Sequence, residues 1–226
     1  MAEHLLREIG KLKKMILALS AVVENSVQKA ARSIEELDRE LANEVLGSDR
    51  EIDRTEVEVE EECLKILALH QPVAIDLRFI VSALKINNDL ERIGDLAVNI
   101  AERTLFLCDE PRINAPFDFS DMCQKTLAML RKALDALMTM DLELARQVRA
   151  DDDAVDEINR EMYMKVSDRI QEAPEQALPL LSYISASRHL ERIADYATNI
   201  SEDIVYMIEG DIVRHKHRPA NELSGT

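Results

Sequence analysis

The sequence predicts an all-α protein built from two tandem three-helix bundles, each with the up-down-up order of a spectrin repeat. Glycine and proline number five and six among 226 residues, aromatic residues make up 4%, and helix-forming residue types dominate the rest. Apolar residues recur over long stretches at the spacing of one helix face. A segment also occurs twice, at residues 90–102 and 190–202, with nine of thirteen positions identical. A duplication in a chain of this length predicts two units of about a hundred residues each.

The first half contains three amphipathic segments. Apolar side chains form one stripe over residues 3–34 and a second stripe over residues 37–66. Gly47 weakens the middle of the second segment, but we predict one continuous helix that ends before Pro72. That proline suits the first turn of a third helix over residues 72–108.

The second half repeats this plan after a linker. Residues 109–120 contain two prolines and no periodicity, which is typical of a loop. Helices are predicted over residues 118–139, 141–172 and 176–209, with Pro174 and Pro179 marking the turn into the last one.

Long helices joined by short turns pack as antiparallel neighbours. We therefore expect a first bundle at residues 1–110, a second at residues 111–210, and a flexible basic tail at residues 211–226.

The polar residues of the duplicated segment form an acidic stripe. On a helix, Glu91, Asp95, Asn99 and Glu102 lie within an arc of roughly 80°, opposite the apolar residues. Like charges four residues apart repel each other by a few tenths of a kcal/mol. A bound cation or a cationic partner would offset this repulsion.

Further acids lie level with this stripe in each predicted hairpin. In the first hairpin, Asp49 and Asp53 on one helix lie almost as far from the turn as Glu91 and Asp95 on the next helix. The difference is two residues, or about 3 Å along a helix. Carboxylate oxygens suit hard ions such as Mg²⁺, Ca²⁺, Mn²⁺ or ferric iron. The alternative is a solvated surface, since acids are frequent in these stretches. The candidate ligands are Asp49, Asp53, Glu91 and Asp95 in the first half, and Asp152, Asp156, Glu191 and Asp195 in the second.

Charge and composition exclude several classes of protein. A formal net charge of −16 argues against a nucleic-acid partner, because such binders need a basic surface. No uncharged run approaches the roughly 20 apolar residues that cross a bilayer, and the charged start is not typical of a signal peptide. The three cysteines lack metal-ligand spacing and are expected to be reduced. We therefore expect a cytoplasmic protein with no direct membrane insertion.

No pattern points to a catalytic residue. The chain has no glycine-rich phosphate loop and no nucleophile elbow, and no histidine follows a glutamate by three residues as in ferritin-type di-iron sites. Arg92 and Arg192 are expected to pair with neighbouring carboxylates, and His189 to be a packing or surface residue. We predict that the protein is not an enzyme. A metal-dependent hydrolase or oxidase and a metal-storage protein remain as alternatives that would use the same carboxylates.

The sequence resembles a known family in both halves. Residues 71–79 and 90–95 closely resemble the first repeat of the PhoU-type phosphate-transport accessory regulators, and residues 189–195 and 206–215 resemble the second. The likeness covers almost the whole chain. It departs from a strict repeat where Gly94 becomes Ala194, a larger residue, and if this side chain crowds the second acidic site, the two metal positions would differ in occupancy.

The resemblance implies a fold, a ligand set and a function. Members of this family are two tandem three-helix bundles, and some bind multinuclear iron or zinc clusters through acidic motifs that match the eight candidate residues. They act with the ATPase subunit of the phosphate ABC transporter and a sensor histidine kinase, and repress phosphate uptake and the phosphate-starvation response. The resemblance thus implies a metal-binding homodimer that lies at the inner membrane through its protein partners.

Overall fold

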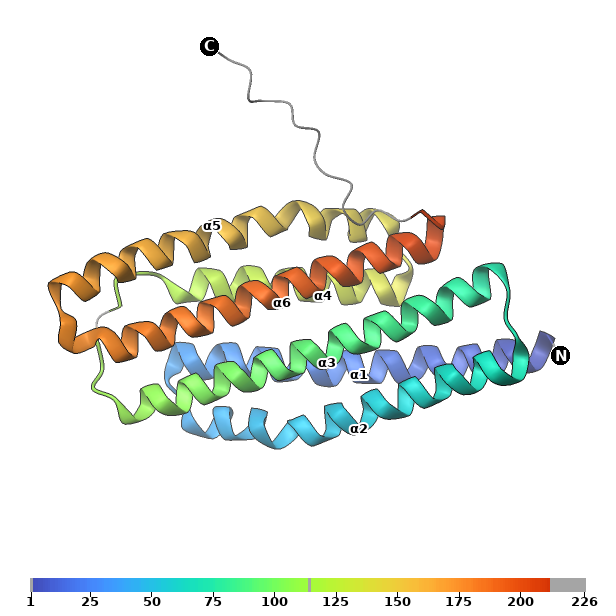
Figure 1. Ribbon diagram of the computed structural model, residues 1–226, viewed down its shortest axis with the longest axis horizontal. Coiled ribbons are helices and arrows are strands. Elements are labelled where there is room, and N and C mark those ends of the chain that lie inside the picture. Colours follow the sequence, from blue (N-terminus) through green and yellow to red (C-terminus); the bar gives the residue numbers. More distant parts are fainter. Residues whose placement is uncertain (1, 114, 212–226) are drawn as a thin grey trace, which may run out of the picture.

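A computed structural model describes residues 2–113 and 115–211 of the chain (Figure 1). Within these residues the protein is helical and contains no strand. The helices are α1 (Ala2–Glu36), α2 (Arg39–His70), α3 (Ala74–Asp109), α4 (Phe119–Thr139), α5 (Leu142–Glu172) and α6 (Ala177–Glu209), with a short 3₁₀ helix η1 (Pro174–Gln176) before α6.

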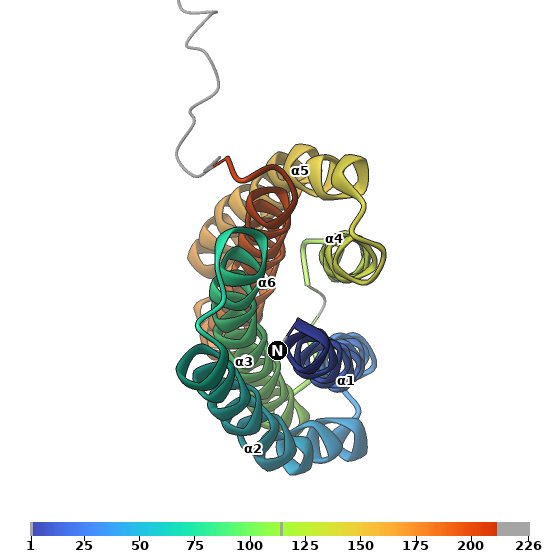
Figure 2. The same cartoon turned by 90° about the vertical axis from the view of Figure 1, so that its right-hand side faces the viewer.

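Each half is an up-down-up group of three antiparallel helices, as the sequence predicts. The two groups pack together chiefly through α3 against α6 and, less extensively, through α1 against α4. Figure 2 shows α2, α3, α6 and α5 side by side in one curved layer, with α1 and α4 against one side of it. The core therefore continues from one half into the other.

Matching residues of the two halves build matching elements. Asp38 caps α2 by accepting hydrogen bonds from the backbone N–H groups of Glu40 (2.8 Å) and Leu41 (3.1 Å). Asp141 caps α5 in the same way, accepting from the N–H of Leu144 at 3.0 Å. Aspartate at this position satisfies backbone donors that the first helical turn leaves unpaired.

Two details test the predicted elements, and a third prediction falls outside the described residues. Helix α2 runs through Gly47 without a break, as predicted. Pro72 lies outside α3 rather than in its first turn, because Gln71, the residue after α2, has a left-handed conformation (φ 46°) and Val73 is extended. Of the predicted basic tail, only Asp211 belongs to the described residues, so residues 212–226 lie outside them.

The core is formed by the apolar faces that the helical spacing predicts. Leu12, Leu19, Ile66, Leu90 and Ile193 are among its fully buried members. Among the described residues, no helix is long and apolar enough to cross a membrane.

Candidate functional site

The acidic residues of the first half lie near one another where α2 packs against α3. Desolvation raises the pKa of Asp49, and the negative charges of Asp53 on its own helix and Asp95 on α3 raise it further. Asp49 and Asp95 are partly buried, whereas Asp53 is exposed. The hairpin therefore brings Asp49 and Asp95 close enough to repel each other, as the residue count from the turn predicts.

Glu91 belongs to the same group. Desolvation raises its pKa, the carboxylates of Asp95, Glu56 and Asp53 add to this effect, and Arg92 opposes it. Nε of Arg92 lies 3.4 Å from Glu91, and its Nη1 lies 3.4 Å from Asp95. The predicted pairing of Arg92 with neighbouring carboxylates is present, and it neutralises only part of the charge.

Glu56 is a member that the sequence analysis misses. Desolvation raises its pKa, followed by the charges of Glu60 and Asp53. The side-chain nitrogen of Asn87 on α3 donates to the Glu56 backbone oxygen at 2.9 Å and to its Oε1 at 3.3 Å. The sequence could have indicated this residue, because Glu56 lies seven residues after Asp49 and residues seven apart share a helix face.

The second half builds an equivalent group between α5 and α6. Desolvation, the charge of Asp195 and then that of Asp156 raise the pKa of Asp152 to about 6. Desolvation also raises the pKa of Asp195 to about 6, followed by the charges of Glu191 and Asp156, while Arg192 opposes the shift. The four predicted acids of this half are therefore electrostatically coupled.

A polar contact between the helices lies beside each acidic group. In the second half, Oγ of Ser187 donates to Oδ1 of Asn159 at 2.7 Å. Ser187 and Asn159 correspond in the repeat to Asn87 and Glu56. Because Asn159 replaces Glu56, this position adds a carboxylate to the first group and none to the second.

We name these two groups the acidic clusters. The first contains Asp49, Asp53, Glu56, Glu91 and Asp95, and the second contains Asp152, Asp156, Glu191 and Asp195. Their donors are oxygen atoms, which suits hard metal ions. Within the residues that the structure describes, no three His, Cys, Asp or Glu side chains already stand in an arrangement that could hold a metal ion. A cation would relieve the repulsion that raises these pKa values, but the carboxylates would have to move closer together around it.

His189 and the cysteines stay outside the acidic clusters. Desolvation and then the charges of Arg192, Arg103 and Arg188 lower the pKa of His189 to about 4. This histidine therefore lies among arginines, consistent with the packing role that the sequence suggests. All three cysteines are free thiols, and Cys63 and Cys123 are buried.

Comparisons with known proteins agree on one family. A sequence model of the family described as "PhoU domain" matches residues 16–104 and 119–204, one match in each half. A Thermotoga maritima protein named phosphate-specific transport system accessory protein PhoU homolog 1 is 37% identical over 208 residues, which are 92% of this chain and 90% of that protein. A Pseudomonas putida protein named as a PhoU homolog of the same kind is 37% identical over 222 residues, which are 97% of this chain and 87% of the relative.

Two crystal structures have the same fold. PhoU from Pseudomonas aeruginosa superposes with a TM-score of 0.87 and 35% identity, over 91% of this chain and 99% of the other. The phosphate transport system regulatory protein PhoU from Streptococcus pneumoniae superposes with a TM-score of 0.81 and 28% identity, over 92% of this chain and 99% of the other.

Proposed function

Because this chain belongs to the PhoU domain family, we propose that it represses phosphate uptake and the phosphate-starvation response when phosphate is plentiful. Its role is that of an accessory regulatory protein of phosphate transport rather than an enzyme, in keeping with the names of its relatives. In this proposal it links the ATPase subunit of the phosphate ABC transporter to a sensor histidine kinase. It works as a homodimer in the cytoplasm, at the inner membrane through those two partners.

One observation carries the proposal most strongly. The family match occurs in both halves and extends over the helices that carry the acidic clusters. A hydrolase or oxidase would also need a general base, a nucleophile or a redox metal centre, and the relatives are named as accessory proteins. Storage of metal alone would not account for names that refer to phosphate transport.

We propose in addition that each acidic cluster holds metal ions. The support is chemical: several carboxylates lie close together, and their mutual repulsion and desolvation raise the pKa of Asp49, Glu91, Asp152 and Asp195. Binding a cation would remove this repulsion. Iron or zinc is suggested by the family resemblance, while Mg²⁺, Mn²⁺ and Ca²⁺ also suit oxygen ligands. The metal would supply a fixed positive charge through which a partner's anionic groups can bind.

A deletion strain tests the regulatory role. Without this protein, alkaline phosphatase should be made even in phosphate-rich medium, and the native gene should restore repression. Normal repression in the deletion strain would contradict the proposal. Purified native protein should also bind the transporter ATPase or the cytoplasmic region of the kinase in a direct binding measurement.

A further inference from the structure

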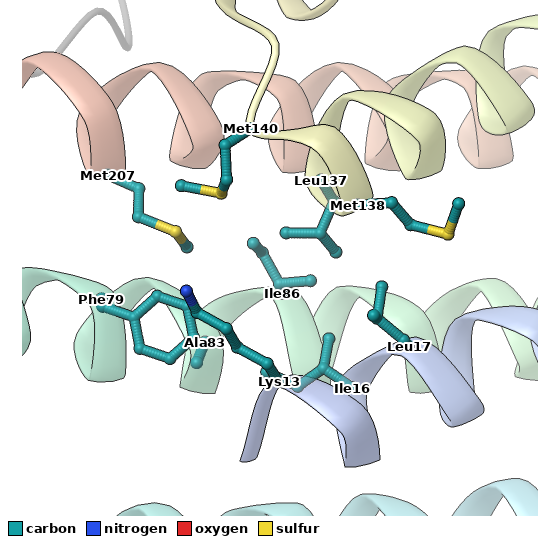
Figure 3. Close-up of a pocket in the computed structure, with 10 residues that line it drawn as sticks. All are labelled: Lys13, Ile16, Leu17, Phe79, Ala83, Ile86, Leu137, Met138, Met140 and Met207. Carbon is teal, nitrogen blue, oxygen red and sulfur yellow. The ribbon is translucent and has the colours of Figure 1, made fainter. Parts of the chain in front are cut away.

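An apolar slot lies where the two halves of the molecule meet. Its lining comes from α1, α3, the end of α4 and α6, and its cavity volume is about 70 Å³ (Figure 3). Ala83 and Ile86 form part of the α3 side, and Leu137 and Met207 lie opposite them across the seam. Cavities between packed units are common places for a ligand or partner to bind.

The opposite end of the molecule shows what this space can accommodate. The repeat relates Ile16 and Ala83 of the slot to Phe119 and Tyr183. The rings of Phe119 and Tyr183 are in contact there, with centroids 5.9 Å apart in an edge-to-face arrangement. Ile16 and Ala83 are smaller than these two rings and leave the slot, which Phe79 lines at the position where the second half has Pro179. An aromatic side chain that enters the slot would therefore lie next to Phe79 and would displace the flexible methionines at its edge.

The charge at the slot favours an acidic partner. Lys13 is the one charged residue among the ten that line it, and its Nζ lies 5.1 Å from the ring centroid of Phe79. Of the four Lys and Arg in the first twenty residues, Arg7 pairs with Glu8 and Lys11 with Glu62, so Lys13 supplies the positive charge at the slot. A carboxylate next to the entering side chain would therefore meet a local positive charge at Lys13.

The lining can also adapt to an entering group. Met138, Met140 and Met207 contribute three flexible thioether side chains, and Met138 is 58% exposed at the edge of the slot. Methionine repacks around inserted side chains at low cost and contacts aromatic rings favourably. Figure 3 shows Met140 and Met207 on the side facing Phe79 and Ile86.

We propose that this slot is a docking site for a partner protein, which inserts an aromatic side chain flanked by acidic residues. The inference rests on the proposed function, since it takes the partner to be the transporter ATPase or the sensor kinase. It places one contact on the seam formed by α1, α3, α4 and α6, in addition to any contact at the acidic clusters between α2 and α3 and between α5 and α6.

Nuclear magnetic resonance of the full chain with ¹³C-labelled methionine methyl groups tests the contact directly. On addition of the purified ATPase, or of the kinase cytoplasmic region, the signals of Met138, Met140 and Met207 should shift. The signal of Met129, which is buried on α4 and does not line the slot, should stay in place. A complex in which the three slot signals do not move would overturn the proposal.

Matched variants test the energetics of the same contact. Met138→Glu and Lys13→Glu should weaken binding about thirtyfold, the usual loss when an aromatic anchor is displaced. Leu178→Glu, at a residue that is 63% exposed on α6, and Lys14→Glu are controls of equal charge change that do not line the slot, and they should bind as the native protein does. Ala83→Tyr, which copies Tyr183, should fill the slot and block binding. If this variant fails to fold, Met138→Glu and Lys13→Glu still test the docking site. Native affinity for the partner in both of them would overturn the proposal.

The two proposals can fail separately. If the native protein binds a partner but the slot variants bind equally well, only the docking site is wrong. If neither partner binds, the proposed link between transporter and kinase is wrong. The slot is then tested with the peptide Glu-Glu-Phe-Glu-Glu at millimolar concentration, against the same peptide with alanine at its centre. Shifts of the three methionine signals with the phenylalanine peptide alone would support the slot, and their absence would overturn it.

Discussion

Gly94 on α3 lies directly against Ile52 on α2, where a Cβ atom at position 94 would stand 3.0 Å from Cδ1 and 3.1 Å from Cγ2 of the isoleucine. The repeat places Ala194 and Val155 at the corresponding positions, and both are buried. Valine has no Cδ1 atom, so the second half has room for the methyl group of Ala194. In the second half, the Cβ of Ala194 therefore takes space that the larger Ile52 side chain fills in the first half.

Gly94→Ala should therefore destabilise the protein, because the new Cβ overlaps Ile52 in a packed interface. We expect the free energy of unfolding to fall by about 1–3 kcal/mol in urea denaturation. Adding Ile52→Val should recover most of this loss by restoring the arrangement of the second half. Gly47→Ala is the matched control, since a Cβ atom added at that position would have no neighbouring atom within 4 Å. It should raise stability by about 0.5–1 kcal/mol, and a loss of stability there would undermine the steric explanation.

Asp195→Asn should stabilise the metal-free protein near neutral pH. The pKa of Asp195 is about 6 in the folded state, above its ordinary value, so its charged form opposes folding. Because the residue is exposed, we expect a gain of only about 1 kcal/mol above the folded pKa. The gain should shrink as the pH falls from about 6 towards 4, where native Asp195 becomes protonated. Urea unfolding of both proteins at several pH values, with a chelator present, measures this difference in the free energy of unfolding. A difference that grows on acidification would contradict this account.

Metal content should depend on both acidic clusters. Asp95→Ala combined with Asp195→Ala removes one carboxylate from each cluster and should lower the bound metal of protein purified from its own host without added salts. Circular dichroism should show intact helices, because neither side chain belongs to the core. If elemental analysis finds the same metal content in this variant as in the native protein, the clusters are solvated surface and do not bind metal.

Glu62 should contribute to stability through its two lysine partners. Its carboxylate accepts from Nζ of Lys11 at 2.7 Å and of Lys65 at 2.9 Å. Although desolvation opposes ionisation, these hydrogen bonds and charges lower the pKa of Glu62 to about 2.

Glu62→Gln should cost about 1–2 kcal/mol at neutral pH, since charged hydrogen bonds at a buried residue are lost. The cost should diminish as the pH falls from about 4.5 towards 2, because native Glu62 is then protonated as well. Thermal unfolding of both proteins across this range checks the direction. A double-mutant cycle with Lys11→Met separates the contribution of that partner, and a cost independent of pH would argue against the ion pairs.

Much of the fold follows from local rules. Helical spacing of apolar residues predicts the six long helices, and the repeat at residues 90–102 and 190–202 predicts two similar halves. Counting from the turns also brings Asp49 towards Asp95 and Asp152 towards Asp195, since an antiparallel hairpin has a fixed rise per residue. Pro72 was misplaced because proline is accepted both in a turn and in the first turn of a helix, and the chain direction after Gln71 decides between them.

The sequence by itself thus determined the helices, the duplication and which carboxylates lie level in each hairpin, because these follow from local periodicity and from the fixed rise per residue of a helix. The tertiary structure alone decided how the halves meet, that Glu56 joins the first cluster, and that a slot lies open beside Ala83 while Tyr183 closes its counterpart. Those features depend on side chains far apart in the chain, whose volumes and charges meet only once α3 has packed against α6.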